Sequence, residues 1–164
     1  MKEIFDVVND NDQVTGKATR YEAHSKGLIH RGVVFFIFDT KGRMLINKRS
    51  KEKEFYPGCW SIALGGHVNA GENQDDAVVR ELKEETGITA KPHYLGSFKK
   101  RFDGLDRENN RVYAFVSDDE PILDPHEVVR GEYVEVPELP KILTEREFIV
   151  ETEVLMGFAE KWVS

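Results

Sequence analysis

Residues 66–88 read GHVNAGENQDDAVVRELKEETGI, and this stretch decides the fold. Its second half predicts a helix over residues 74–86, because apolar side chains recur there on one helical face. Asn73 is the expected N-cap, an acidic first turn suits the positive end of the helix, and Gly87 fits the C-cap. A glycine-containing loop leads into the helix. The stretch therefore predicts a loop, a helix and a second turn in direct succession.

Three glutamates crowd one turn of the predicted helix. At about 100° per residue, Glu81, Glu84 and Glu85 occupy little more than one quadrant of its surface. Carboxylates this close repel one another, and a bound divalent cation removes the repulsion. Mg²⁺ prefers oxygen ligands, commonly one or two carboxylates together with substrate phosphates. We therefore predict a Mg²⁺ site here, with Mn²⁺ as a substitute. A solvated helix with Arg80 and Lys83 as ion-pair partners is the other interpretation.

Strands and further helices are predicted outside this stretch. Apolar runs bounded by turn residues indicate strands at residues 4–9, 13–20, 32–38, 43–48, 60–68, 92–102, 111–117 and 131–136. The run at 32–38 is apolar throughout, which indicates burial on both faces. Helices are expected at 21–26 (one turn), 137–143 and 145–162.

The stretch from Gly66 to Ile88 resembles the Nudix box: Gly, five residues, Glu, seven residues, then Arg-Glu-aliphatic-any-Glu-Glu-any-Gly-aliphatic. Every specified position is filled, by Gly66, Glu72, Arg80, Glu81, Leu82, Glu84, Glu85, Gly87 and Ile88. Such a match would arise by chance in a chain of this length with probability on the order of 10⁻⁷. The resemblance implies a Nudix fold of the α/β (α+β) class, in which a mixed β-sheet is sandwiched between helices and carries a catalytic loop–helix–loop.

The resemblance also implies a set of metal ligands. Glu81, Glu84 and Glu85 are the implied carboxylate ligands, with Glu85 and Glu81 as the firmer pair. A backbone carbonyl of the preceding loop, from Gly65 or Gly66, joins them. Residues without a Cβ suit such a close approach of backbone to ion.

The implied catalytic residues are Glu81 and Glu84, either of which could be the general base, with Arg80 in a supporting role. The fork of donors on Arg80 would tie together the carboxylates of the loop and the helix. Family members differ in the choice of base, and some take it from outside the box. Glu127 and Glu132 are the alternatives of that kind in this chain.

From about residue 3 to residue 140 the chain also looks like isopentenyl-diphosphate isomerases and the hydrolases closest to them. Isomerases of this kind bind a metal through histidines, and His24, His30 and His67 stand near those positions. The three histidines are either a second metal site or ordinary hydrogen-bonded residues, and the sequence leaves both interpretations open.

The chain departs from the isomerase pattern at the residues that carry the chemistry. The isomerase cysteine position is Gly65, and Cys59 lies six residues upstream. Where isomerases place paired glutamates, near residues 108–112, this chain offers only Glu108. Isomerisation needs a proton donor and a partner that removes a proton. Hydrolysis needs only what is present, so hydrolysis is the predicted reaction.

The predicted function is Mg²⁺-dependent cleavage of a phosphoanhydride bond in a nucleoside diphosphate linked to another group. Arg49, Lys48 and His67 are the candidate substrate-binding residues, because Arg49 ends a strand that leads toward the site. An isomerase and a non-catalytic nucleotide-binding module are the alternatives. The identity of the linked group is not encoded in any motif, since substrate choice in this fold lies in loops.

Composition limits the remaining possibilities. With 164 residues the chain fits one Nudix domain over residues 1–164, and a formal net charge of −7 argues against a nucleic-acid surface. No apolar run is long enough to span a bilayer, the N-terminus lacks the apolar core of a signal peptide, and the one cysteine has no partner for an intramolecular disulfide. We therefore expect a cytoplasmic enzyme whose substrate is a small-molecule diphosphate. A homodimer through the N-terminal hairpin or the C-terminal helix stays open.

Overall fold

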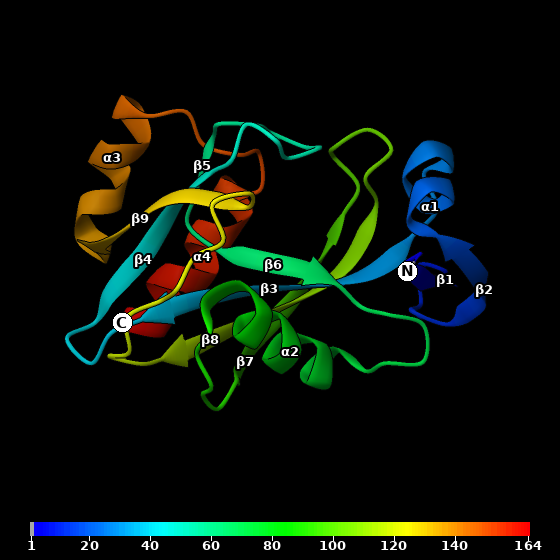
Figure 1. Ribbon diagram of the computed structural model, residues 1–164, viewed down its shortest axis with the longest axis horizontal. Helices are drawn as coiled ribbons and strands as arrows, with labels where there is room; N and C mark the ends of the chain where they lie inside the picture. Colours follow the sequence, from blue (N-terminus) through cyan, green and yellow to red (C-terminus); the bar gives the residue numbers. More distant parts are fainter. Residues whose placement is uncertain (1) are drawn as a thin grey trace.

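The computed structural model describes residues 2–164, which form a mixed sheet covered by helices on both faces (Figure 1). The strands are β1 (Ile4–Val8), β2 (Val14–Thr19), β3 (His30–Phe38), β4 (Arg43–Arg49), β5 (Trp60–Ser61), β6 (Leu64–His67), β7 (His93–Lys100), β8 (Glu108–Val116) and β9 (Val128–Glu135). The helices are α1 (Arg20–Lys26), α2 (Gln74–Thr86), α3 (Leu139–Glu145) and α4 (Thr152–Val163), with a 3₁₀ turn η1 (Val136–Glu138) before α3. This is the predicted fold class, a mixed sheet between helices.

Strand β3 is the centre of the sheet. It pairs in parallel with β8 along its whole length, from His30↔Glu108 to Phe38↔Val116, and antiparallel with β6 and β1. Its side chains alternate between two cores: Phe35 packs in the cluster beneath α2, and Phe36 in the cluster beneath α4. The strand is therefore buried on both faces, as its apolar run predicts.

Helix α2 begins and ends where its capping residues predict. The Asn73 side chain accepts a hydrogen bond from the Asp76 backbone N–H at 2.8 Å, and Gly87 adopts the left-handed conformation with φ 74°. Val78 and Leu82 are fully buried against the sheet. Because they fix the rotation of the helix, the Glu81 side chain lies against Gly66 of β6.

Two predicted elements differ in the structure. The strand expected at 60–68 is two short strands, β5 and β6, and the Asn47 amide donates to the Ser61 and Ala63 carbonyls at the break. The helix expected from residue 145 begins at Thr152. Residues 146–149 are extended instead, because the Trp60 backbone donates to the Glu147 carbonyl at 2.8 Å and accepts from the Ile149 N–H at 3.0 Å. Pairing with a free strand edge outweighs the helical spacing of the apolar residues.

The N-terminal elements β1, β2 and α1 lie at one end of the molecule, beside the loop between β7 and β8 (Figure 1). The Arg107 side chain in that loop donates to the carbonyl of Gly27, which ends α1. Segments about 80 positions apart in sequence thus meet at one edge of the sheet. Within residues 2–164 no helix has both the length and the apolar character required to cross a membrane.

Candidate metal and phosphate site

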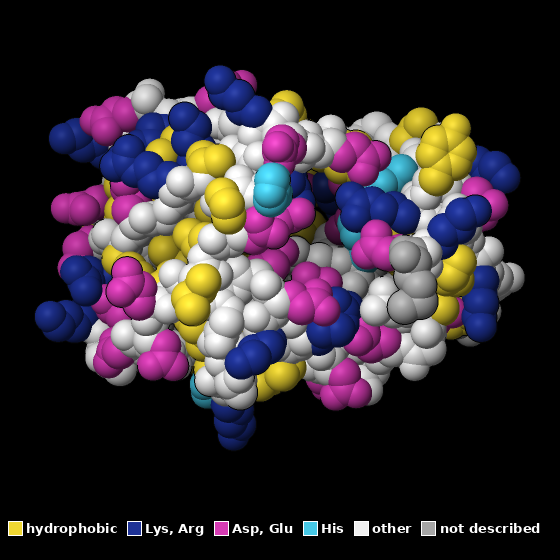
Figure 2. Space-filling view, in the orientation of Figure 1, with side chains coloured by type: hydrophobic (Ala, Val, Ile, Leu, Met, Phe, Trp, Pro, Cys, Tyr) yellow, Lys and Arg dark blue, Asp and Glu magenta, His cyan; other side chains and the backbone are white. Residues whose placement is uncertain are grey.

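One cavity of about 170 Å³ lies beside α2 and reaches the edge of the sheet. Its wall includes Glu85 from α2, Gly65 and Gly66 from β6, and Glu108 from β8. Acidic, basic and histidine side chains gather around a hollow on the face drawn in Figure 2. Residues that are distant in the sequence therefore share one polar cavity.

Arg80 holds the loop and the helix of the box together. Its Nε and Nη2 donate to the two carboxylate oxygens of Glu72, each at 2.9 Å. Its Nη1 donates to Glu81 at 2.8 Å and to Glu84 at 3.2 Å, and Nη2 also donates to the His67 carbonyl at 3.0 Å. The hydrogen bonds from Arg80 lower the pKa of Glu72. All of these contacts are structural, so Arg80 is placed to orient the site.

Glu81 and Glu85 form a partly buried pair of carboxyl groups. Burial raises the pKa of Glu81, and burial with repulsion from Glu81 raises the pKa of Glu85 well above its usual value. Within residues 2–164, Glu85 Oε2 is buried and accepts no hydrogen bond. Two such anions are costly without a counter-ion, and a divalent cation is the ion that carboxylate oxygens hold best. The donor set therefore fits Mg²⁺.

The glycines of β6 leave room for this pair. A Cβ on Gly66 would stand 2.2–2.5 Å from the carboxyl atoms of Glu81, and a Cβ on Gly65 would stand 2.6 Å from the Val33 carbonyl oxygen. The glycines are therefore required by close packing. Glu84, in contrast, is 58% exposed and lies outside the cavity wall, where it contacts Arg80.

Two of the predicted substrate-binding residues, Lys48 and Arg49, end β4, and the third, His67, ends β6. Arg49 lines the cavity and donates from Nε and Nη2 to the Phe55 carbonyl at 3.1 and 2.7 Å. Lys48 does not contribute to this wall in the described part of the chain, because neighbouring residues of a strand face opposite sides. His67 lines the cavity.

Two further cations belong to the wall. Arg20 begins α1 and pairs with Glu3 at 3.1 Å and with Glu54 at 3.2 Å. Lys53 pairs with Glu127, which also lines the cavity. Neither residue is among the substrate-binding residues predicted from the sequence, since nothing local links the start of α1 or the loop after β4 to the box. Of the two glutamates considered outside the box, Glu127 faces the cavity. Glu132 instead pairs with Arg146, at 2.6 Å.

The three histidines come together beside the cavity, whose wall includes His67. The ring centroids of His24, His30 and His67 lie 5.2 Å apart in every pairing. Phe5 stacks on His30 and on His67, at 5.1 and 4.8 Å. His30 Nδ1 donates to the Leu28 carbonyl at 2.9 Å, which leaves its Nε2 free of a proton when the ring is neutral. The cluster is ordered as a set of ligands would be.

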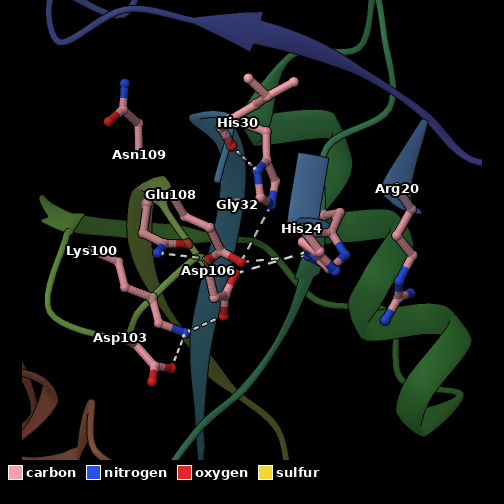
Figure 3. Close-up of polar contacts among 12 residues, drawn as sticks. Arg20, His24, His30, Gly32, Lys100, Asp103, Asp106, Glu108 and Asn109 are labelled. Carbon is pink, nitrogen blue, oxygen red and sulfur yellow. Dashed lines mark hydrogen bonds and ion pairs between the residues drawn. The ribbon is translucent and has the colours of Figure 1, made fainter. Parts of the chain in front are cut away.

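Two carboxylates complete the cluster (Figure 3). Glu108 Oε1 lies 3.4 Å from His67 Nε2 and 3.6 Å from His30 Nε2, and Asp106 Oδ1 lies 3.9 Å from His24 Nε2. These distances are long for hydrogen bonds, but atoms bound to one ion at about 2.1 Å are roughly 3–4 Å apart. We call His24, His30, His67, Asp106 and Glu108 the histidine–carboxylate centre. Sequence analysis found only Glu108 of its acids and missed Asp106.

Burial and neighbouring charges shift the pKa values of three groups in the centre. Burial alone would lower the pKa of His30, but its contact with Glu108 raises it. Burial, with repulsion from His67 and His30, lowers the pKa of His24 to about 4, so its ring is neutral at pH 7. Burial alone would raise the pKa of Glu108, but its polar contacts with His30 and His67 hold that pKa well below the usual value. Neutral imidazoles and an ionised carboxylate are the forms that bind divalent metals. Gly32 has no Cβ where Glu108 and Asn110 approach β3.

The NUDIX domain family model matches residues 28–152, so this chain belongs to the Nudix family. An uncharacterized Nudix hydrolase of Streptomyces coelicolor is 40% identical over 101 residues, which cover 62% of this chain and 56% of that protein. The chain thus spans little more than half of that relative. An isopentenyl-diphosphate Delta-isomerase of Pectobacterium atrosepticum is 33% identical over 137 residues, which cover 81% of this chain and 76% of the isomerase. The family therefore includes neighbours named for two different reactions.

Solved structures agree with the assignment. The crystal structure of a Deinococcus radiodurans protein superposes with a TM-score of 0.80 at 26% identity and covers 97% of this chain and 98% of its own. The agreement extends over the N-terminal hairpin and α4, which lie outside or at the border of the family match. The resemblance of this chain to the Nudix family and to its isomerase-like branch is thereby confirmed.

Proposed function

We propose that this protein is a Mg²⁺-dependent hydrolase that cleaves the diphosphate of a nucleoside diphosphate linked to another group. The observation that carries the proposal is Glu85 beside Glu81: within the described residues its Oε2 is buried without a hydrogen bond, and it lines a cavity whose wall also includes Arg20, Arg49 and Lys53. A diphosphate is an anion that such a wall attracts, and it supplies oxygens that complete the coordination of Mg²⁺. The same wall also carries the acids Glu54, Glu85, Asp106, Glu108, Glu127 and Glu151, so a bound divalent cation would be needed to make the local field positive where the substrate sits.

The residues of the cavity have separable tasks in this reaction. Glu81 and Glu85 would hold the ion, and Arg80 keeps Glu81 and the loop in register. Bound Mg²⁺ supplies charge neutralisation at the phosphate oxygens and acidifies its water. Arg49 and Lys53 are placed to orient the diphosphate, because both line the cavity that Glu85 also lines. This division assigns binding and orientation to side chains of α2, β4 and the loop that follows β4.

The general base is chosen here by access to the cavity. Glu84 is half exposed and outside the wall, whereas Glu127 lies in the wall beside Lys53. We therefore add Glu127 to Glu81 and Glu84 as the candidates. Glu127→Gln should reduce turnover more than Glu84→Gln at saturating Mg²⁺. Equal activity of the Glu127 variant and the wild-type protein would remove Glu127 from the candidates.

The direct test is a substrate panel with and without metal. Nucleoside di- and triphosphates, nucleotide sugars, dinucleoside polyphosphates and ADP-ribose would be incubated with Mg²⁺ or Mn²⁺, and phosphate products would be separated and quantified. We expect release of a mononucleotide from at least one diphosphate-linked compound, and its abolition by a chelator. Tight binding without turnover across the panel would contradict the proposal and would favour a nucleotide-binding module.

A second function has a specific observation in its favour. The histidine–carboxylate centre opens into the same cavity, and the relative from Pectobacterium atrosepticum is named an isopentenyl-diphosphate Delta-isomerase. This chain, however, has Gly65 where the resemblance expects a thiol. Cys59 is buried and burial raises its pKa, so it is no substitute acid. Incubation with isopentenyl diphosphate in heavy water decides the point, because isomerisation would place deuterium in the recovered substrate and hydrolysis would not.

A further inference from the structure

Lys100, the last residue of β7, is a buried cation surrounded by carboxylates. Only 4% of the residue is exposed. Its ammonium lies 2.6 Å from Asp106 Oδ2 and 3.4 Å from Asp103 Oδ2, and it also contacts Glu151 Oε1. Figure 3 shows Lys100 reaching between Asp103 and Asp106. The side chain thus joins the end of β7, the β7–β8 loop and the segment before α4.

The three acids around this ammonium are arranged as ligands of an ion. One oxygen each from Asp103, Asp106 and Glu151 lie within 4.8 Å of one another. Burial alone would lower the pKa of Lys100, but the charges of Glu108, Glu151 and Asp106 raise it above its ordinary value, so the side chain stays charged. An ammonium held by three carboxylates replaces the cation that such a trio would otherwise attract.

Asp106 belongs to this trio and also to the histidine–carboxylate centre. Its Oδ2 accepts from Lys100, while its Oδ1 faces His24 Nε2 at 3.9 Å. In the part of the chain that the structure describes, Oδ1 is buried and accepts no hydrogen bond. The two oxygens of the Asp106 carboxylate therefore face two sites. Lys100 holds Oδ2, and Oδ1 faces the histidines.

We propose that Lys100 is a positioning residue that occupies the cation position of the Asp103–Asp106–Glu151 trio, keeps divalent ions out of it, and reserves Asp106 Oδ1 for the histidine–carboxylate centre. A divalent ion in the trio would compete for both oxygens of Asp106. A tethered ammonium does not exchange with the solution and offers donors to all three acids. The second half of the proposal rests on metal binding at the histidine–carboxylate centre put forward above.

Lys100→Met tests the proposal by removing the charge while keeping most of the side-chain volume. We expect the variant to bind one more Mn²⁺ per chain than the wild-type protein in equilibrium dialysis. Lys99→Met is the matched control, because Lys99 is the exposed neighbour on the same strand and its loss should leave the ion count unchanged. Adding Glu151→Gln to Lys100→Met removes one acid of the trio, and the double variant should return to the wild-type count.

An unchanged ion count in a folded Lys100→Met protein would overturn the proposal, as would an additional ion that persists in the double variant. If Lys100→Met folds poorly, thermal unfolding with and without Mn²⁺ gives the answer: the proposal requires a larger rise in Tm than in the wild-type protein, and an equal rise contradicts it. The visible spectrum of bound Co²⁺ reports imidazole ligation separately. A wild-type spectrum without imidazole ligands would refute the histidine–carboxylate centre, whereas the ion count of the variants still decides the role of Lys100 in the trio.

Discussion

The cavity has two ends that differ in how the sequence builds them. The box end takes its acids from one helix and the loop before it, all within residues 66–88. The histidine–carboxylate end takes its ligands from α1, β3, β6, β8 and the loop that precedes β8. The first is a local unit that caps and apolar spacing specify. The second exists only because β3 pairs in parallel with β8 and places Glu108 beside His30. One cavity thus combines a site that a sequence motif predicts with a site that only the tertiary structure assembles.

The largest effect is expected from Glu85→Gln, which removes a ligand charge at the box end and preserves shape. Turnover should fall on the order of 10²–10³-fold, the scale of losing one preorganised electrostatic contact at a reacting centre. Glu160→Gln, at an exposed position of α4, is the control and should keep wild-type rates. Near-full activity of Glu85→Gln at saturating Mg²⁺ would show that the box end takes no part in the reaction.

Gly66→Ala should come next, because the added methyl group would stand 2.2–2.5 Å from the carboxyl atoms of Glu81. A displacement of that ligand by about 1 Å would reduce turnover roughly 100-fold. Gly16→Ala on β2 is the matched control, since a Cβ there meets no atom of residues 2–164 within 4 Å. Steady-state rates measured with both variants test the packing argument, and equal rates would contradict it.

Arg80→Lys should weaken Mg²⁺ binding or activity at the box end without removing a positive charge. A lysine ammonium does not reproduce the paired hydrogen bonds to Glu72 or reach Glu81 and the His67 carbonyl together. We expect a loss of about 10–100-fold in Mg²⁺ affinity or activity, the range for residues that orient metal ligands. A Mg²⁺ titration of activity measures this effect. An unchanged midpoint of the Mg²⁺ titration would show that activity does not depend on the paired donors of the Arg80 guanidinium.

The smallest effect is a pH dependence at the other end of the cavity. The pKa of His24 is about 4 in the folded protein against 6.5 for the ordinary side chain, so below pH 6.5 the unfolded chain binds the additional proton. Metal-free protein should therefore lose stability as the pH falls from about 6.5 to about 4, relative to His24→Asn, by roughly 2 kcal/mol. Urea unfolding of both proteins at several pH values provides the comparison. Parallel stability curves would contradict the shift and its cause in the crowded histidines.

Sequence patterns predicted the elements that depend on neighbours in the chain. The helix over 74–86 has its caps at Asn73 and Gly87, and the apolar run at 32–38 is a strand covered on both faces. The predicted helix from residue 145 was wrong at its start, because Phe148 and Ile149 lie beside Trp60 in an extended segment. Apolar spacing reports which residues are buried, and here a strand edge buried them as well as a helix would.

The sequence alone determined the acid cluster of the box, its helix and the glycines around it, because a motif of 23 residues carries its own caps, turn and charge pattern. The tertiary structure decided which distant side chains join that cluster. Arg20 and Lys53 reach the cavity from outside the box, and Asp106 reaches the histidines through a loop anchored by Lys100. These encounters follow from strand pairing and loop closure between distant parts of the chain, such as the pairing of His30 with Glu108, for which no local pattern in the sequence exists.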